Sequence, residues 1–287
     1  MHEPIPYDPG KEALLQPERR PPLADFAAGW TIEQACAEFA RLAYLRFEED
    51  AGQETVLADT LRKAGFAGPA CLSDEETGAE AFVTAMPDGT SLVAFRGTQS
   101  DKRKDLLTDA RFWLRTWAGP GRVHQGFLQS WLALKPKIIE ALGGFAENRL
   151  VITGHSLGAA LATLMACEHR AATLITFGSP RVGDKAFAAQ FAGRDVRRYV
   201  DCADFVSRVP PPIIYRHVAE RRYIDRFGGI HDPPPGLLAV MGDRWAARLA
   251  YLVKHAWRLR TNAPARSAAD HAPINYVSAL LGRRGAP

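Results

Sequence analysis

Strand-like and helix-like patterns alternate between residues 123 and 201, and this alternation constrains the fold more than any other feature of the chain. Short apolar runs rich in β-branched residues, such as RLVIT at 149–153 and ATLITFG at 172–178, each stand beside a segment with helical spacing of apolar residues. Strands separated by helices in this way are typical of βαβ units, whose strands are parallel. The sequence therefore predicts an α/β fold with a mostly parallel central sheet flanked by helices.

The rest of the chain is expected to form one domain preceded by an arm. Residues 1–29 are rich in proline and polar residues, which predicts an extended or poorly ordered N-terminal arm. An antiparallel hairpin is expected where AFVTAM (81–86) and SLVAF (91–95) flank the turn signal PDGT. No internal repeat or linker interrupts residues 30–287, so these residues are expected to be a single domain.

Charge, cysteine content and hydropathy exclude several classes of protein. The net charge is only +4 and no long run of Lys and Arg accompanies it, which argues against nucleic acid as a partner. The 4 cysteines form no CxxC pair, so we expect no zinc site and no other bound metal. No apolar stretch is long enough to span a bilayer, and the N-terminus lacks the apolar segment of a secretory signal peptide. The default expectation is a cytoplasmic protein, with export without a cleaved signal left open.

A Gly-x-Ser-x-Gly motif places Ser156 at the junction between the strand pattern 149–153 and a helix pattern at 157–166. Gly154 permits a sharp bend, and Gly158 with the alanines after it lets the helix approach the strand closely. A serine on such a turn has its hydroxyl exposed, as in hydrolases that use a serine nucleophile. A glycine-rich turn without chemistry is the alternative interpretation.

A nucleophilic serine needs a histidine that accepts its proton and a carboxylate that orients the histidine. In α/β folds with this turn, the chain order is Ser, then Asp or Glu, then His. Asp201 ends the strand pattern VRRYVD and Asp204 follows in the next turn, so both qualify as the acid. The candidates for the base are His271 and His231 on predicted loops, His217 in a strand-like segment and His255 in a helix pattern.

Five segments resemble, in order, the motifs of the class 3 lipases, also called fungal-type lipases. They are VAFRGT (93–98), VHQGFLQSW (123–131), ITGHSLGAALATL (152–164), VDCADFVSRVPP (200–211) and DHAPINYV (270–277). The resemblance implies an α/β-hydrolase fold and the hydrolysis of carboxylic esters, typically acylglycerols. It implies an ester or lipid substrate as the partner, and no metal or organic cofactor.

Carried over position by position, the resemblance implies a role for five residues. Ser156 would be the nucleophile, Asp204 the acid and His271 the base. The backbone N–H and hydroxyl of Thr98 and the backbone N–H of Leu157 would form the oxyanion hole. The chain is thus predicted to be a serine carboxylic-ester hydrolase, a lipase or esterase that acts through an acyl-enzyme.

Two alternatives to this function stay open. One is another serine hydrolase, such as a phospholipase, thioesterase or amidase, because the triad does not select the leaving group. The other is a non-catalytic lipid-binding relative. Asp201 stands where the family usually has asparagine, which leaves the choice of carboxylate open. His124 and His155 match structural positions of the family.

Two amphipathic segments could contact lipid. Residues 99–117 occupy the place of the lid in the family, with a charged first half and one apolar helical face in the second half. A packed helix and a mobile lid are both open, and the charges predict modest interfacial activation. Residues 244–260 surround an apolar face with basic residues and tryptophans, which suits peripheral contact with a lipid surface, although a helix packed on the domain is favoured.

Overall fold

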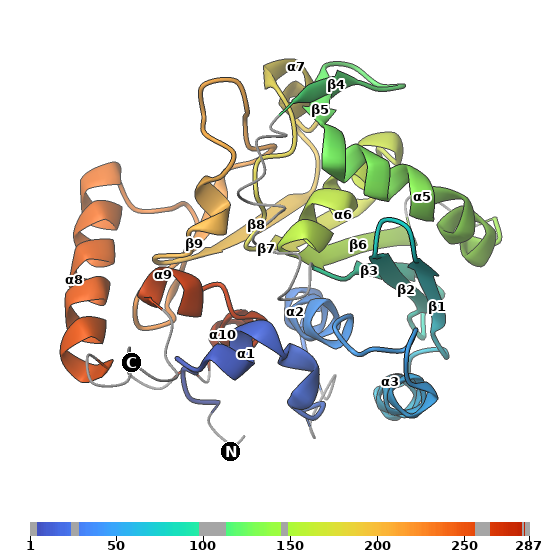
Figure 1. Cartoon of the computed structure of the whole chain (residues 1–287), viewed down its shortest axis with the longest axis horizontal. Coiled ribbons are helices and arrows are strands. Elements are labelled where there is room, and N and C mark those ends of the chain that lie inside the picture. Colours follow the sequence, from blue (N-terminus) through green and yellow to red (C-terminus); the bar gives the residue numbers. More distant parts are fainter. Residues whose placement is uncertain are drawn as a thin grey trace.

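A central sheet with helices on both faces forms the body of the protein (Figure 1). The computed structural model describes residues 5–23, 29–97, 113–144, 149–255, 265–282 and 284. The strands of the main sheet are β1 (Ala70–Asp74), β2 (Ala79–Ala85), β3 (Ser91–Phe95), β6 (Leu150–His155), β7 (Thr173–Phe177), β8 (Val196–Asp201), β9 (Arg221–Ile224) and β10 (Ile230–His231). A separate two-stranded ribbon consists of β4 (Leu114–Thr116) and β5 (Arg122–His124).

The helices precede, connect and follow these strands. They are α1 (Lys11–Leu15), α2 (Ile32–Leu42), α3 (Ala51–Lys63), α5 (Gln125–Leu142), α6 (Leu157–Glu168), α7 (Lys185–Ala189), α8 (Leu237–His255), α9 (Arg266–Ala269) and α10 (Pro273–Leu280), with 3-10 turns η1 (Pro17–Arg19) and η3 (Val206–Arg208). In Figure 1, α5 and α6 lie above the sheet, whereas α2, α3 and α10 lie below it.

The strand order is β1-β2-β3-β6-β7-β8-β9-β10. The five strands from β3 to β9 pair in parallel, while β1, β2 and β10 add antiparallel edges. The predicted α/β class, the mostly parallel sheet and the hairpin of β2 and β3 are therefore confirmed. Because the strands from β3 to β9 run the same way, their carboxyl ends and the loops that follow them meet at one edge of the sheet.

Strand β3 shows how the two faces of the sheet divide the core. Leu92 and Ala94 belong to the apolar cluster shared with α2 and α10. Val93 and Phe95 belong to the cluster shared with α5 and α6. Successive side chains of a strand point to opposite faces, so a strand that is covered on both sides is apolar at every position rather than at every second one.

The N-terminal segment does not extend away from the body, contrary to the predicted extended arm. Residues 5–23 contain α1 and η1, and the side chains of Ile5, Tyr7 and Leu14 are buried. Burial of these apolar groups stabilises the docked segment despite its prolines. The division into an arm at 1–29 and one domain at 30–287 stays a prediction.

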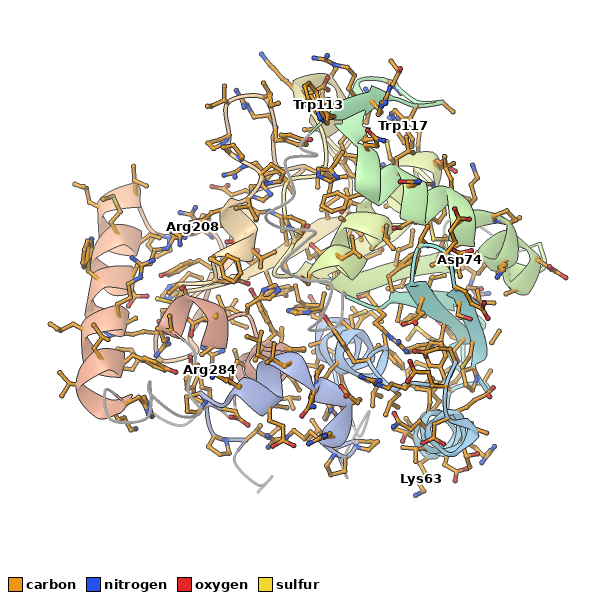
Figure 2. The ribbon with its side chains drawn as sticks, viewed as in Figure 1. Lys63, Asp74, Trp113, Trp117, Arg208 and Arg284 are labelled. Carbon is orange, nitrogen blue, oxygen red and sulfur yellow. The ribbon has the colours of Figure 1, made fainter. Side chains whose placement is uncertain are left out.

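The segment at the place of the family's lid is only partly covered by the structure. Residues 98–112 lie outside the described residues, and with them Thr98 and the first part of the predicted helix. The described end of this segment differs from the prediction, because residues 114–116 form β4 and pair with β5 instead of continuing a helix. Trp113 and Trp117 lie beside this ribbon (Figure 2). Among the described helices, none is long and apolar enough to cross a bilayer.

Candidate active site

The turn from β6 into α6 holds Ser156 in a strained conformation. Its φ of 59° and ψ of −124° make it the one non-glycine residue with positive φ among those the structure describes. A Cβ at Gly154 would collide with the backbone of Gly158, and a Cβ at Gly158 would collide with the carbonyl oxygen of Phe95. The two glycines thus let strand and helix approach closely enough to turn the serine outward, as the motif predicts.

Ser156, His271 and Asp204 form a continuous chain of hydrogen bonds. The Ser156 Oγ lies 2.8 Å from His271 Nε2, and His271 Nδ1 lies 2.8 Å from Asp204 Oδ2. The carboxylate can only accept, so Nδ1 carries the hydrogen and Nε2 is free to accept the hydrogen of the serine hydroxyl. Ser156 comes from the β6–α6 turn, Asp204 from the loop after β8 and His271 from the link between α9 and α10.

All three side chains are enclosed, and the serine is the most open of them. Relative exposure is 6% for Ser156, 1% for His271 and 0% for Asp204. A charge interaction between an imidazole and a carboxylate is stronger in such surroundings than in water. The arrangement has the geometry that proton transfer from a serine hydroxyl to an imidazole requires.

Gly178, at the end of β7, makes room for this chain of hydrogen bonds. Its φ is +58°, and a Cβ on it would lie 2.8 Å from Asp204 Oδ2 and 2.9 Å from His271 Nδ1. Any side chain here would therefore push the carboxylate and the imidazole apart. The sequence analysis did not identify Gly178, although a glycine directly after a buried strand, in FGSP, is a detectable signal.

Asp204 is held by two further donors. The hydroxyl of Tyr276 donates to Oδ2 at 2.6 Å, and the backbone N–H of Val206 donates to Oδ1 at 2.8 Å. Burial and the nearby Asp204 carboxylate raise the pKa of Tyr276 well above its ordinary value, which keeps the phenol protonated as a donor. Tyr276 was noted from sequence only as the end of a motif, and its contact with the acid was not foreseen.

Asp201, the competing carboxylate, points into a different set of contacts. It is ion-paired with Arg284 and accepts a hydrogen bond from the N–H of Cys202 at 2.7 Å. Its backbone N–H donates to the hydroxyl of Tyr276 at 3.1 Å. The structure thus brings Asp204 to His271, whereas Asp201 forms an ion pair with Arg284. No sequence spacing indicates the pairing of Asp201 with Arg284.

The other candidate histidines lie in other surroundings. His231 Nε2 is 2.8 Å from Asp225 Oδ2, and His217 Nε2 is 2.8 Å from the carbonyl oxygen of Ser207. His217 lies outside the strands, contrary to the predicted strand position, whereas His255 belongs to helix α8, in agreement with the predicted helix pattern.

His124 and His155 support the site without joining the chain of hydrogen bonds. His124 caps α5, and its Nδ1 accepts from the N–H of Gly126 at 3.2 Å. The His155 ring lies 4.4 Å from the His271 ring, centre to centre, and its Nδ1 is 2.8 Å from the hydroxyl of Tyr44. Their structural roles agree with the resemblance stated above.

Of the two residues predicted for the oxyanion hole, the structure describes Leu157 and not Thr98. Leu157 is the first residue of α6, so its N–H belongs to the first turn, whose N–H groups have no partner within the helix. The N-terminus of a helix also favours negative charge. The chain leading to Thr98 is held by Arg96, whose Nε donates to the carbonyl oxygen of Ala43 at 2.7 Å. At Gly97 a Cβ would collide with the hydroxyl of Tyr44, so the backbone passes close to its neighbours there.

Asp270 connects the segments that carry Asp204 and His271. Its Oδ2 accepts from the N–H of Ala203 at 2.9 Å, next to Asp204 in the chain. Its Oδ1 accepts from the hydroxyl of Tyr7 at 2.7 Å, and Arg266 pairs with it at 2.5 Å. The docked N-terminal segment therefore contacts the residue immediately before His271.

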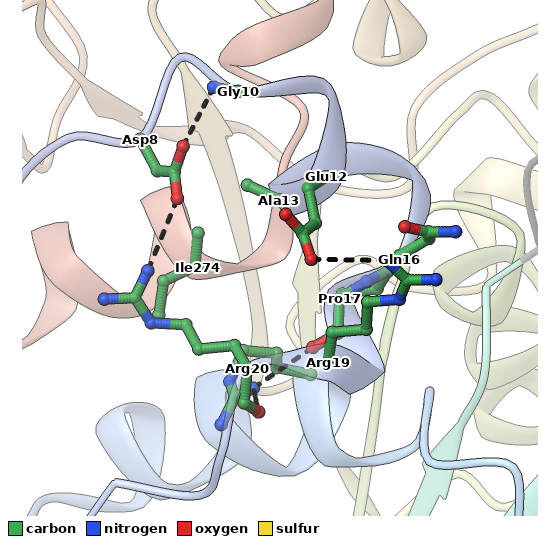
Figure 3. Close-up of a pocket in the computed structure, with 10 residues that line it drawn as sticks. Asp8, Gly10, Glu12, Ala13, Gln16, Pro17, Arg19, Arg20 and Ile274 are labelled. Atoms are coloured by element: carbon green, nitrogen blue, oxygen red, sulfur yellow. Dashed lines mark hydrogen bonds and ion pairs between the residues drawn. The ribbon is translucent and has the colours of Figure 1, made fainter. Parts of the chain in front are cut away.

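A cavity lies under the N-terminal segment (Figure 3). Two ion pairs lie in its wall, Asp8 with Arg20 at 3.4 Å and Glu12 with Arg19 at 3.6 Å. The three residues of the hydrogen-bond chain are not part of this wall. Within the described residues, no cluster of three His, Cys, Asp or Glu side chains could hold a metal ion.

Part of the chain is similar in sequence to known lipases. Residues 92–213 match the family model of the class 3 lipases. The chain is 35% identical over 149 residues to the secreted mono- and diacylglycerol lipase 1 of Fusarium solani, covering 47% of this chain and 44% of the relative. It is 34% identical over 149 residues to the secreted mono- and diacylglycerol lipase A of Penicillium cyclopium, covering 46% and 47%.

The solved propeptide complex of Rhizomucor miehei lipase shares the fold, with a TM-score of 0.53, 24% identity, and coverage of 67% of this chain and 66% of that one. The sheet and its helices therefore define an α/β-hydrolase fold, as predicted. Residues 92–213 are thus similar to the class 3 lipases. The chain spans just under half the length of the two curated relatives.

One expectation is corrected by these relatives. The default of a cytoplasmic protein is wrong by this comparison, because both curated relatives are secreted lipases. The expectation rested on the lack of an apolar leader pattern, and an absence of that kind does not specify a compartment.

Proposed function

We propose that this protein is a serine carboxylic-ester hydrolase that cleaves acylglycerols or related fatty-acyl esters. The observation that carries the proposal is the unbroken chain from Ser156 Oγ to His271 and Asp204, with 2.8 Å at each step, on a strained turn between strand and helix. The two curated relatives are named as mono- and diacylglycerol lipases, which supports a glycerol ester as the substrate class.

In the first stage, Ser156 Oγ attacks the ester carbonyl carbon while His271 Nε2 accepts the hydroxyl hydrogen. The imidazolium that forms is stabilised by Asp204, which stays ionised and holds the Nδ1–H. His271 then donates the proton from Nε2 to the departing alcohol oxygen, and an acyl-serine remains.

In the second stage, His271 removes a proton from water, which attacks the acyl carbon and releases the fatty acid. Ser156 recovers its hydrogen from Nε2, so the enzyme returns to its starting state. The same Asp204 contact is needed in both stages, because each stage passes through the imidazolium. Gly178 keeps this contact short by leaving the space beside it empty.

The oxyanion of both stages would lie between the N–H of Leu157, at the start of α6, and the backbone N–H and hydroxyl of Thr98. Each donor placed this way is worth about 3 kcal/mol in the barrier of acyl transfer. The position of Leu157 in the first turn of α6 supports its part of this assignment.

The assignment is tested with the Ser156→Ala variant. We expect loss of fluorophosphonate labelling and a fall of at least about a thousandfold in the hydrolysis of p-nitrophenyl esters, because the nucleophile is removed while the oxyanion donors stay. An unchanged far-UV circular dichroism spectrum controls for folding. Retained turnover of esters in Ser156→Ala would remove the nucleophile and the proposed mechanism with it.

Two matched pairs test the partners of the serine. Asp204→Asn is expected to lower kcat far more than Asp201→Asn, and His271→Ala far more than His231→Ala, since only the first member of each pair lies in the hydrogen-bond chain. Ester, thioester and amide analogues of one acyl group, compared in the same assay, separate an esterase from a thioesterase or an amidase. Equal losses within a pair would contradict the corresponding assignment.

A further inference from the structure

Helix α8 stands at the edge of the molecule and contacts the body through only one narrow face. Its buried side chains are Val240, Ala247, Tyr251 and His255. Val240 and Ala247 pack with Cys202 and Tyr223, while Tyr251 packs with Tyr7 and Ala269. These two small clusters are separate from the clusters that enclose the sheet. Figure 1 shows α8 as the outermost element on its side of the molecule.

The opposite face of α8 is apolar and exposed. We call this face the α8 stripe, and its residues with their exposure are Leu238 (83%), Met241 (46%), Trp245 (68%), Leu249 (66%), Leu252 (49%) and Val253 (78%). The spacing by three and four residues makes them neighbours along one side of the helix. No charged residue interrupts the stripe. The sequence favours a helix that packs on the domain, and it does pack, but with its narrow side rather than with this apolar side.

Arginines border the stripe. Arg244 follows Met241 by three residues and Arg248 precedes Leu252 by four, so both lie beside it on the helix surface. Burial and the charges of Arg244 and Arg248 lower the pKa of Arg208. Figure 2 shows Arg208 on the side of the body that faces α8. Within the described residues, these arginines make no ion pair with a carboxylate.

We propose that the α8 stripe, with Arg244 and Arg248 along its border, docks the protein onto an anionic lipid surface. An amphipathic helix that lies in the plane of an interface buries its apolar side among acyl chains and places its basic residues at the headgroups. The positive charge of these arginines favours an anionic lipid surface, because guanidinium groups bind phosphate with favourable geometry. This docking function goes beyond ester hydrolysis and does not depend on the triad.

The test measures binding to vesicles in the Ser156→Ala background, so that no lipid can be cleaved. Sedimentation with vesicles of POPC and POPG at two to one is compared with sedimentation with POPC alone. We expect binding to the POPG vesicles, and at least tenfold weaker binding after Trp245→Ser with Leu249→Ser. Arg248→Glu is expected to weaken binding about fivefold or more with POPG, and little with POPC alone.

Matched variants elsewhere on the surface control for general effects. Leu132→Ser with Ile139→Ser removes two exposed apolar residues of α5, and Lys63→Glu reverses a charge on α3, at the far side of the molecule from Arg208 (Figure 2). These controls should bind as the parent does. The same stripe substitutions in the wild-type background should leave hydrolysis of a soluble short-chain ester within about twofold, which shows that the fold and the triad are intact.

Two results would overturn the proposal. One is equal vesicle binding by the parent and by Trp245→Ser with Leu249→Ser. The other is a dimer in sedimentation velocity that these two substitutions abolish while vesicle binding is unchanged, since the stripe would then be an interface between copies. Binding is measured without turnover, so a failure of the proposed hydrolase function would leave either result readable.

Discussion

Helices α6 and α8 are both rich in apolar residues, yet the protein treats them in opposite ways. Eleven of the 12 residues of α6 are buried, whereas only 4 of the 19 residues of α8 are. Helix α6 is apolar on all sides, which is typical of a helix inside the protein. Helix α8 combines a narrow inner face with an exposed apolar face. The spacing of apolar residues predicts a helix in both cases, but it does not predict that the body leaves the broad apolar face of α8 exposed.

The two helices also differ in how closely they approach their neighbours. Behind Ser156, α6 lies so near β3 and β6 that backbone touches backbone, through Gly158 and Gly154. Helix α8 contains Gly242, and a Cβ there would meet nothing within 4 Å. The region around α6 is therefore intolerant of added atoms because it fixes the geometry of the site, while α8 has room to change.

The largest expected effect comes from adding one methyl group to α6. In Gly158→Ala the new Cβ would collide with the carbonyl oxygen of Phe95 and with the backbone of Arg96, neither of which can swing aside. We expect the free energy of unfolding to fall by about 3 kcal/mol or more, measured by urea denaturation. A loss below about 1 kcal/mol would contradict the close contact of α6 with β3.

The second effect concerns the pH dependence of stability that the buried His124 causes. Burial lowers the pKa of His124, at the start of α5, from 6.5 to about 4. Between these values the unfolded chain binds more protons than the native protein, so stability is complete above about pH 6.5 and is lost as the pH falls through about 4.

Between pH 7 and pH 4.5, we expect the free energy of unfolding of the parent to fall by about 2–3 kcal/mol more than that of His124→Asn. This corresponds to about 1.4 kcal/mol for each pH unit. Asparagine can still cap α5, so the variant should fold. His217, whose pKa burial also lowers, contributes with the same sign in both proteins and leaves part of the pH dependence in place. Urea denaturation at the two pH values measures the free energy of unfolding of both proteins. An equal fall in parent and variant would show that His124 is protonated in the native state.

The smallest effect completes the comparison on α8. Gly242→Ala places a methyl group in open space at an exposed position inside the helix. We expect a gain of about 0.5–1 kcal/mol, because alanine has the higher helix propensity and restricts the unfolded chain. The thermal midpoint should rise by a few degrees. A loss comparable to that of Gly158→Ala would mean that α8 is packed on its outer face as well.

Local pattern was sufficient to predict most of the sheet. The alternation of strand and helix from 123 to 201 predicted β6, β7 and β8 with the helices between them, because both periodicities are properties of neighbouring residues. The ribbon β4–β5 was missed, since a helical face over 106–117 and a short strand at 114–116 compete for the same apolar residues and only pairing with β5 decides. Docking of residues 5–23 was missed because it depends on partners more than 200 positions away, such as Asp270.

The candidate site likewise contains residues that the sequence predicted and contacts that only the structure shows. Ser156 follows from its motif and its place between β6 and α6, and the resemblance supplied Asp204 and His271, which the structure brings together. Sequence spacing favoured Asp204 over Asp201 only slightly. The choice is made in space by Arg284, which pairs with Asp201, and by Tyr276, which donates to Asp204. The space left by Gly178 is likewise visible only once three loops have met.

The guanidinium groups of Arg266 and Arg284 both contact the ring of Tyr7, and the hydroxyl of Tyr7 donates to Asp270, the residue before His271. Both outer segments of the described chain thus contact residues next to the loops that carry Asp204 and His271. A purification tag or fusion partner that displaces Tyr7 or Arg284 would remove a contact of Asp270 or of Asp201. Protein engineers who attach this chain to a carrier would therefore do better to insert at an exposed turn, such as that between β2 and β3, than to extend it tightly at either terminus.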